Sequence, residues 1–377
     1  MTRSSVASPL LRFVPALCLL VVPSADALAQ DNSCTQPAPV CDARDAVFAV
    51  SSFDPVGSAV RIGPERLVTS RHIVADRKTA TLFLPNGRPI EVAVVPNDYR
   101  GDLVLLESAA LPPGPALRAT ELEPDALLYT IGADVSLRRI RAYDPGRSRL
   151  LPAEGFPLAR LHHGAYSQPG NSGGALVDEA GRLVGIVASG GEGRFEAIPA
   201  AAIATLKARS GAVHADASAE IGAAVRVCTT LVEEFKGGRL ADQEAKAIAT
   251  ACRRSGNRQL MDLAGQVLGA GGRSEAAIAL FEQGLAEDPN AINTRVGLVV
   301  AHHLTRDFEA ALPHLHWLMD HVDDDLQVLR LAIQAGAWAD DRALAERALA
   351  RLKEVNPQTA PAAERFLNNP PPRPPKP

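Results

Sequence analysis

Short apolar runs fill the chain from about residue 46 to residue 200, separated by glycine, proline and polar residues. The runs are rich in valine, leucine and isoleucine, follow one another at roughly even spacing and lack helical periodicity. Strands spaced in this way indicate an all-β sandwich or barrel. They include VFAVSSF, SAVRIG, RLVTS, TATLFLP, IEVAVV, LVLLES, LLYTIG, GALVD and LVGIVAS.

The pattern changes after Pro199, where the apolar residues of AAIATLKARS recur every three or four positions. That spacing predicts a helix that closes the β domain. Residues 211–218 read GAVHADAS and are interpreted as a short linker. From residue 219 onward we expect helices throughout, so the chain divides into a β domain and an all-α region.

The helical region repeats itself, since Gly237–Arg239 recurs 34 residues later as Gly271–Arg273. Glu275–Ala277 recurs at the same interval as Glu309–Ala311. A helix-turn-helix period of this length is the signature of tetratricopeptide repeats. The segment RSEAAIALFEQGLAEDPNA resembles the second helix and exit turn of that family. The resemblance covers about residues 223–358 and implies a solenoid whose concave face binds proteins or peptides.

The N-terminus has the pattern of a secretory signal. Arg3 and Arg12 precede the apolar run FVPALCLLVV, and Ala27 and Ala29 offer small residues for cleavage before Gln30. The run is too short to span a bilayer. We therefore expect an exported, periplasmic or secreted protein without a membrane span after cleavage. The alternative interpretation is an uncleaved anchor.

Four cysteines follow that segment, an even number in what would be an oxidising compartment, and we expect two disulfides. The sequence leaves three connectivities open, of which the local pairings Cys34–Cys41 and Cys228–Cys252 are preferred. The second pair would join the two antiparallel helices of the first repeat across the turn at Gly237. No two of these cysteines form a tight CxxC, which disfavours a zinc site.

Charge and histidine spacing exclude other classes of function. The formal net charge is -4, and no stripe of lysine and arginine is interleaved with aromatic residues, so nucleic acid is not an expected partner. The paired histidines lack a recognisable third ligand at metal spacing. We expect neither a metal nor a cofactor. The pairs are His162-His163, His302-His303 and His314/His316.

Three segments carry candidate catalytic residues. RLVTSRHIV places His72 after a predicted strand, and an imidazole suits general-base catalysis near neutral pH. NDYRGDLVLLE places Asp102 at the mouth of a strand, with Asp98 as a rival carboxylate. PGNSGG allows a tight turn that presents Ser172 and points backbone amides inward. Each residue taken alone is also compatible with a surface, turn or capping role.

In the order His, Asp, Ser, these segments resemble the chymotrypsin-like fold, most closely its Deg/HtrA branch of bacterial envelope proteases. The blocks LVTSRHIV, DLVLLE, PGNSGGALVDEAGRLVGI and FEAIP are similar to blocks of that branch, over about residues 46–208. The resemblance implies that His72 is the base, that Asp102 orients it and that Ser172 is the nucleophile. The amides of Gly170 and Ser172 are the implied donors of the oxyanion hole.

Some features depart from the branch. Ala175 replaces the usual proline after GNSGG, and helical repeats stand where a PDZ domain would follow, so a trimeric cage and peptide sensing are not implied. In trypsin-like enzymes the pocket base lies about six residues before the nucleophile, here near Tyr166, and GAYSQP contains no acid. We therefore expect small or medium apolar side chains rather than Arg or Lys, with Tyr166 and Ser189 as candidate pocket residues.

The predicted protein is multidomain, with an all-β double-barrel protease domain and an all-α solenoid. The tail NNPPPRPPKP is expected to be a disordered, extended polyproline segment. The predicted boundaries are 1–29 for the signal peptide, 30–45 for an N-terminal linker, 46–210 for the protease domain, 211–222 for a linker, 223–358 for the repeats and 359–377 for the proline-rich tail.

The sequence thus predicts an exported serine endopeptidase that cleaves protein or peptide substrates through an acyl-enzyme. The solenoid would recruit a substrate or a protein partner. The competing hypothesis is a non-catalytic or latent protease-like scaffold whose main role is protein binding through the helical repeats.

Overall fold

The computed structural model describes residues 34–135, 139–191 and 193–376. All the elements described below belong to one compact unit, residues 36–377. The predicted signal segment, residues 1–29, lies outside the described residues. Among the residues that the structure describes, no helix combines the length and apolar character needed to cross a bilayer.

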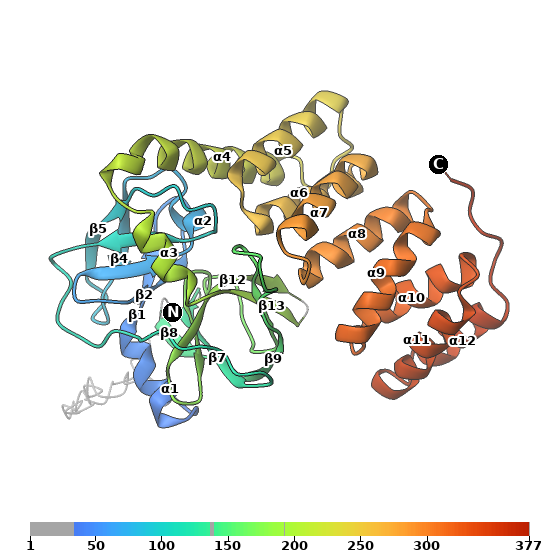
Figure 1. Ribbon diagram of the computed structural model, residues 1–377, viewed down its shortest axis with the longest axis horizontal. Helices are drawn as coiled ribbons and strands as arrows, with labels where there is room; N and C mark the ends of the chain where they lie inside the picture. The colour runs from blue at the N-terminus through green and yellow to red at the C-terminus, as the bar shows by residue number, and fades with distance from the viewer. Residues whose placement is uncertain (1–33, 136–138, 192, 377) are drawn as a thin grey trace, which may run out of the picture. The chain divides into compact units, whose positions relative to one another are not determined.

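The first β-barrel is closed by six strands in the order β1-β2-β3-β6-β5-β4 (Figure 1). Alternation of inward and outward side chains is clearest in β4, where Ala80 and Leu82 are buried and their neighbours are more exposed. Two short helices, α1 (Ala38–Ala43) and α2 (Arg71–Val74), precede β1 and follow β3. The strands are β1 (Val47–Ser51), β2 (Gly57–Arg61), β3 (Arg66–Thr69), β4 (Thr79–Phe83), β5 (Pro89–Val95) and β6 (Val104–Glu107).

The second barrel is also closed. Its sheet has the order β11-β12-β13-β10-β9-β7-β8, and an additional pairing of β11 with β7 completes a ring of six strands to which β8 is attached. The predicted double-barrel architecture is therefore confirmed. The strands are β7 (Leu127–Asp134), β8 (Arg139–Ala142), β9 (Gly146–Leu150), β10 (Leu161–His163), β11 (Ala175–Asp178), β12 (Leu183–Gly191) and β13 (Arg194–Pro199).

One buried apolar cluster spans the two barrels. Val60 and Val68 of the first barrel belong to the same buried cluster as Ile131 and Ile186 of the second. The loops that follow β3, precede β6 and precede β11 lie beside this contact, as the hydrogen bonds described below show. The double barrel thus brings together the three segments that carry the candidate catalytic residues.

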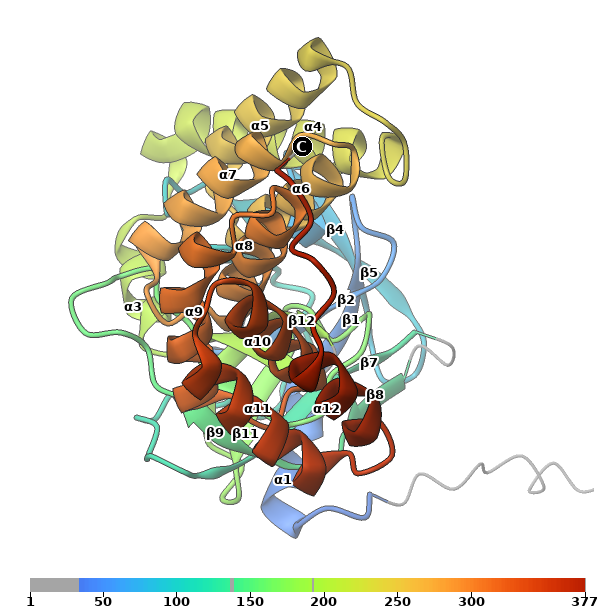
Figure 2. The ribbon, with the colours of Figure 1, turned by 90° about the vertical axis from the view of Figure 1, so that its right-hand side faces the viewer.

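Helices fill residues 202–368, after the second barrel, and those from α4 onward stack side by side (Figures 1 and 2). Helices α6, α8 and α10 start at Arg258, Ile292 and Leu326, at intervals of 34 residues, and α7, α9 and α11 follow with the same interval. This spacing is that of the predicted repeat. The helices are α3 (Ala202–Ala208), α4 (Ala215–Glu234), α5 (Asp242–Ser255), α6 (Arg258–Ala270), α7 (Ser274–Glu287), α8 (Ile292–Leu304), α9 (Phe308–His321), α10 (Leu326–Trp338), α11 (Arg342–Val355) and α12 (Ala360–Asn368).

Some elements extend past the predicted boundaries. Helix α4 begins at Ala215, inside the expected linker 211–222, because the sequence there is rich in alanine, which has a high helix propensity. Helix α12 lies inside the expected tail, with Pro361 in its first turn, a position that tolerates proline. Helix α1 lies within the expected N-terminal linker.

The proline-rich segment after α12 forms neither helix nor strand within residues 369–376, as predicted. It is not free, however. The Trp338 indole donates a hydrogen bond to the Pro371 carbonyl at 3.1 Å, and Arg373 pairs with Glu309 on α9. The expectation of a disordered tail is therefore wrong for these residues, because an indole and a carboxylate on the helices bind it.

The structure confirms one of the two preferred cysteine pairings, Cys228–Cys252. Cys228 on α4 and Cys252 on α5 are bonded to each other, and both are fully buried. Cys34 and Cys41 are also disulfide-bonded. The Cys228–Cys252 bond joins the first two helices of the helical region, as predicted.

Replacing Cys228 and Cys252 together with alanine is expected to lower the free energy of unfolding by about 3 kcal/mol, because the bond restricts the unfolded chain. The two residues are 24 positions apart, which sets the size of the closed loop. Urea unfolding followed by circular dichroism measures the change. Equal unfolding midpoints for the variant and the oxidised wild type would contradict it.

Candidate active site

Three loops bring the predicted residues to one place. His72 lies in α2, directly after β3, and Asp102 lies just before β6, which pairs with β3. Ser172 lies in the turn before β11, and its carbonyl accepts a hydrogen bond from the amide of Ser58 on β2 at 2.8 Å. The serine-bearing turn of the second barrel is therefore attached to the first barrel beside the His72 loop.

His72 and Asp102 form a buried pair. The imidazole Nδ1 lies 2.6 Å from Asp102 Oδ2, and the backbone amide of His72 donates to Asp102 Oδ1 at 2.9 Å. Asp102 is only 2% exposed. The rival carboxylate, Asp98, instead pairs with Arg209 at 2.9 Å. With Nδ1 held by Asp102, the imidazole Nε2 is the nitrogen left to exchange a proton.

Opposing effects set the charges of this pair. Burial lowers the pKa of His72, but the negative charge and hydrogen bond of Asp102 outweigh it, so the pKa of His72 is raised. Burial raises the pKa of Asp102, yet His72 and the more distant Arg160 outweigh that effect and lower it. Asp102 is therefore an anion near neutral pH, and it stabilises a positive charge on His72.

The turn that contains Ser172 depends on glycine. Gly170 has a φ of 97° and Gly173 a φ of 80°, conformations that side chains disfavour. A Cβ at Gly173 would lie 2.2 Å from the Ser58 carbonyl oxygen, so the turn and β2 approach too closely for any other residue. Ser58 Oγ also donates to the Gly170 carbonyl at 2.7 Å. These contacts fix the backbone that presents Ser172.

Ser172 Oγ donates to the carbonyl of Ala188 on β12 at 3.3 Å. It makes no hydrogen bond to His72 among the residues that the structure describes. Within those residues the backbone amides of Gly170 and Ser172 also donate to no acceptor. Two unused amides beside a serine can bind an oxyanion. The missing hydrogen bond between Ser172 and His72 is compatible with catalysis, because such bonds often form only when substrate binds.

The two candidate pocket residues, Tyr166 and Ser189, differ in their exposure and their contacts. The Tyr166 ring is 48% exposed and contacts Phe195, with 6.2 Å between ring centroids. Ser189 is engaged in polar contacts, since its hydroxyl accepts from Arg160 at 2.8 Å and donates to Glu196 at 3.1 Å. Tyr166 is therefore available to contact a ligand, whereas Ser189 is held by its neighbours.

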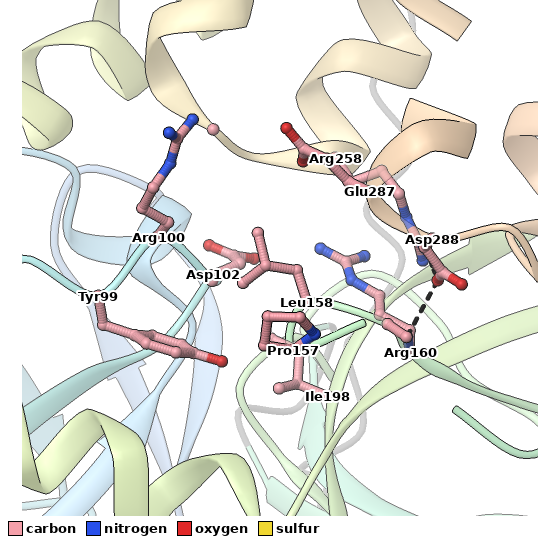
Figure 3. Close-up of a pocket in the computed structure, with 13 residues that line it drawn as sticks. Tyr99, Arg100, Asp102, Pro157, Leu158, Arg160, Ile198, Arg258, Glu287 and Asp288 are labelled. Carbon is pink, nitrogen blue, oxygen red and sulfur yellow. Dashed lines mark hydrogen bonds and ion pairs between the residues drawn. The ribbon is translucent and has the colours of Figure 1, made fainter. Parts of the chain in front are cut away.

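A buried charged cluster lies next to the candidate site and was not predicted from the sequence. Glu196 on β13 accepts from Arg160 at 3.2 Å, from Asn293 at 3.0 Å and from Arg258 on α6. Arg258 also pairs with Asp288, whose carboxylate accepts from the Arg160 amide at 3.0 Å. Figure 3 shows Arg160, Arg258 and Asp288 around a small pocket that Asp102 also lines. The charged cluster joins the second barrel to the helices.

Glu196 and Arg258 keep their charges although they are buried, since the pKa of Glu196 is lowered and that of Arg258 is raised. Burial raises the pKa of Glu196, but Arg258, the neighbouring His162 and Arg160 together lower it well below its usual value. Burial lowers the pKa of His162 to about 4, so this histidine is neutral near pH 7. The signal that the sequence offered was Glu196 itself, an acid inside the otherwise apolar stretch FEAIP.

Comparison with known proteins defines the class of the barrels. Residues 57–186 match the family model of the trypsin-like peptidase domain, a segment that includes His72, Asp102 and Ser172. The chain therefore contains a trypsin-like serine peptidase domain, and its relatives include proteases of the HtrA type.

Proteins of known function or structure are similar to part of the chain. Mitochondrial serine protease HTRA2 of Bos taurus is 28% identical over 128 residues, which are 32% of this chain and 28% of that protein. Serine protease Rv3671c of Mycobacterium tuberculosis is 28% identical over 141 residues, 35% of each chain. The solved inactive form of the Rv3671c protease is 24% identical with a TM-score of 0.40, and the match covers 47% of this chain and 98% of that one. The chain thus spans about a third of the length of these curated relatives.

Proposed function

We propose that the protein is a serine endopeptidase that cleaves protein or peptide substrates through a Ser172, His72 and Asp102 triad. The observation that carries this proposal is the buried His72–Asp102 pair, at 2.6 Å, beside the glycine turn that presents Ser172. A trypsin-like peptidase domain at the same residues supports it. The reaction that these groups can perform is acyl transfer to water.

The mechanism follows from the positions of the groups. Ser172 Oγ turns from the Ala188 carbonyl toward His72 Nε2, gives up its proton and attacks the substrate carbonyl carbon. The developing oxyanion is bound by the amides of Gly170 and Ser172. His72 then donates the proton to the leaving amine, which leaves an acyl-enzyme. His72 next removes a proton from a water molecule, which attacks the acyl carbon. His72 then returns this proton to Ser172 Oγ, and the acid product is released.

The proposed pocket selects small or medium apolar side chains. Tyr166 and Phe195 offer aromatic surface, and no acid stands at the position of Tyr166 to bind Arg or Lys. Glu196, a buried acid that accepts a hydrogen bond from Ser189, is already paired with Arg160 and Arg258. A basic substrate side chain would therefore find no unpaired anion there.

We also propose that the protein is exported to the periplasm or secreted, and that its tetratricopeptide-like helices recruit a substrate or a protein partner. Disulfide-bonded cysteines support an oxidising compartment. The 34-residue spacing of the helices supports a solenoid with a concave binding face.

The dependence of kcat/KM on pH tests the role of His72. The neutral form of His72 accepts the proton, and its pKa is raised, so activity should be lost as pH falls through a value above about 6.5. Hydrolysis of a quenched fluorescent peptide between about pH 5 and pH 9 gives the profile. An inflection at or below the ordinary histidine value would contradict the assignment.

A latent enzyme is the second candidate function, favoured by one observation. Ser172 Oγ is bonded to the Ala188 carbonyl rather than to His72. A latent enzyme would hydrolyse the peptide slowly alone and faster when a partner protein binds the helices. Activity that is full in the purified protein and unchanged by helix-binding peptides would exclude latency.

A further inference from the structure

A groove lies where the helices face the peptidase domain. It encloses about 660 Å³, within the range of ligand-binding pockets. Helices α6 and α8 provide most of its walls, and Phe281 of α7 and Gln327 of α10 also line it. The remaining wall is Ser189–Gly191 and Arg194 of the second barrel. The helical groove, as we call this cavity, is therefore shared between the solenoid and the barrel.

The floor of the helical groove is apolar and shaped by glycine. Leu263 is 37% exposed and Leu304 is 48% exposed, although both are large apolar residues. The Phe281 ring packs against Gly265 and Gly297, where a Cβ would lie 2.4 Å and 2.6 Å from ring atoms. Larger residues at these glycines would displace the ring. The small residues thus keep the two helices close around Phe281 and leave the leucines exposed.

Amide side chains surround this floor. Gln259, Gln266, Asn293 and Gln327 all line the helical groove, and amides can both donate to and accept from a peptide backbone. Gln259 Oε1 is buried and has no hydrogen-bond partner within the described residues. Asp262 is the acidic residue of the lining, and its carboxylate accepts a hydrogen bond from the Thr294 hydroxyl. Burial raises the pKa of Asp262 to about 7. This chemistry fits an uncharged apolar polypeptide segment.

The helical groove adjoins the proposed active site along β12. Ser172 Oγ is bonded to the Ala188 carbonyl, and Ser189–Gly191 are the next residues of β12. The pairing of β12 with β11 ends at Ile186, whereas the pairing of β12 with β13 continues to Gly191. Residues 189–191 therefore keep one edge to which an extended peptide can add as a strand.

We propose that the helical groove continues the substrate cleft and binds the substrate segment that precedes the cleaved bond. The proposal rests on the proposed function. Residues 189–191 cover about 10 Å at about 3.3 Å per residue, so the fourth and earlier residues before the cleaved bond reach the groove. Leucine, isoleucine or valine there would contact Leu263 and Leu304. The proposed occupant of the helical groove is thus the substrate chain itself.

Casein digestion and two peptides test this proposal with the full-length protein. Mass spectrometry of a denatured casein digest identifies the preferred cleavage site. Two peptides are made from it, one starting three residues before the cleaved bond and one starting eight residues before it with leucine at the added positions. The longer peptide is expected to have a kcat/KM about tenfold higher.

Leu304→Glu should remove most of this advantage and leave hydrolysis of the short peptide unchanged. The matched control is Val227→Glu, because Val227 on α4 is similarly exposed, at 40%, and does not line the groove. The control should keep the advantage. In the Ser172→Ala protein, fluorescence anisotropy should show about tenfold tighter binding of the longer peptide.

The outcomes separate this proposal from the proposed function. Equal kcat/KM for the two peptides, or an advantage that Leu304→Glu does not reduce, would overturn the groove proposal and leave the peptidase assignment standing. Tighter binding of the longer peptide without faster cleavage would show that the groove does not hold the segment that precedes the cleaved bond in a productive position, which also overturns it. Absence of any cleavage, with no labelling of Ser172 by a fluorophosphonate, would overturn the proposed function and this inference with it.

Discussion

Ser172→Ala is expected to lower kcat for peptide hydrolysis by about a millionfold, the scale seen when a triad nucleophile is removed. The variant lacks the oxygen that attacks the substrate, whereas the His72–Asp102 pair and the free amides remain. The folded structure should be little changed, because within the described part of the chain Ser172 Oγ makes one hydrogen bond, to the Ala188 carbonyl. Hydrolysis of the preferred peptide measures the loss.

The double variant Ser172→Ala/His72→Ala should be no slower than Ser172→Ala alone, because the triad acts as a unit. Ser108→Ala is the matched control, since this serine lies on the first barrel with an exposed hydroxyl contact. It should retain full activity. A Ser172→Ala protein that keeps more than about a tenth of the activity would contradict the assignment of the nucleophile.

Glu196→Gln is expected to lower the free energy of unfolding by about 3 to 5 kcal/mol. The substitution keeps the shape of the side chain and removes the charge that Arg160 and Arg258 share, both of which are at most 5% exposed. Asp288 would remain as a partner of Arg258, but Arg160 would lose its carboxylate ion pair. Unfolding in a chemical denaturant measures this loss, as a shift of the transition midpoint with an unchanged dependence of the free energy on denaturant concentration.

Glu107→Gln is the matched control for the charged cluster. Glu107 pairs with Arg66 at 2.6 Å on the surface, where both side chains are more than a third exposed, so its removal should cost less than about 1 kcal/mol. A loss for Glu196→Gln that is no larger than this control would mean that the charged cluster contributes little to holding the helices against the second barrel.

Local sequence determined much of the fold. The short valine-rich runs predicted strands because each has one apolar face, and the 34-residue period predicted the helix spacing because every unit must bury a similar face. The Cys228–Cys252 bond was the preferred of the open pairings, because the two cysteines were expected on neighbouring antiparallel helices. The blocks around His72, Asp102 and Ser172 were identifiable because each combines its polar residue with a fixed local context.

The charged cluster could not be predicted because its members are distant in sequence. Arg258 meets Glu196 across 62 positions and Asp288 across 30, and nothing local distinguishes these residues from surface charges. The hydroxyl direction of Ser172 was equally inaccessible, because it depends on the Ala188 carbonyl from another strand. The bound tail was missed for the same reason, since its partners are Trp338 and Glu309.

Labelling with a fluorophosphonate probe tests the central claim, an activated Ser172, most directly. The purified wild-type protein, Ser172→Ala and His72→Ala are treated in parallel, with circular dichroism to show that each is folded. The triad predicts rapid labelling of the wild type, none of Ser172→Ala and strongly slowed labelling of His72→Ala. Folded wild-type protein that stays unlabelled, or that labels equally fast without His72, would contradict the claim.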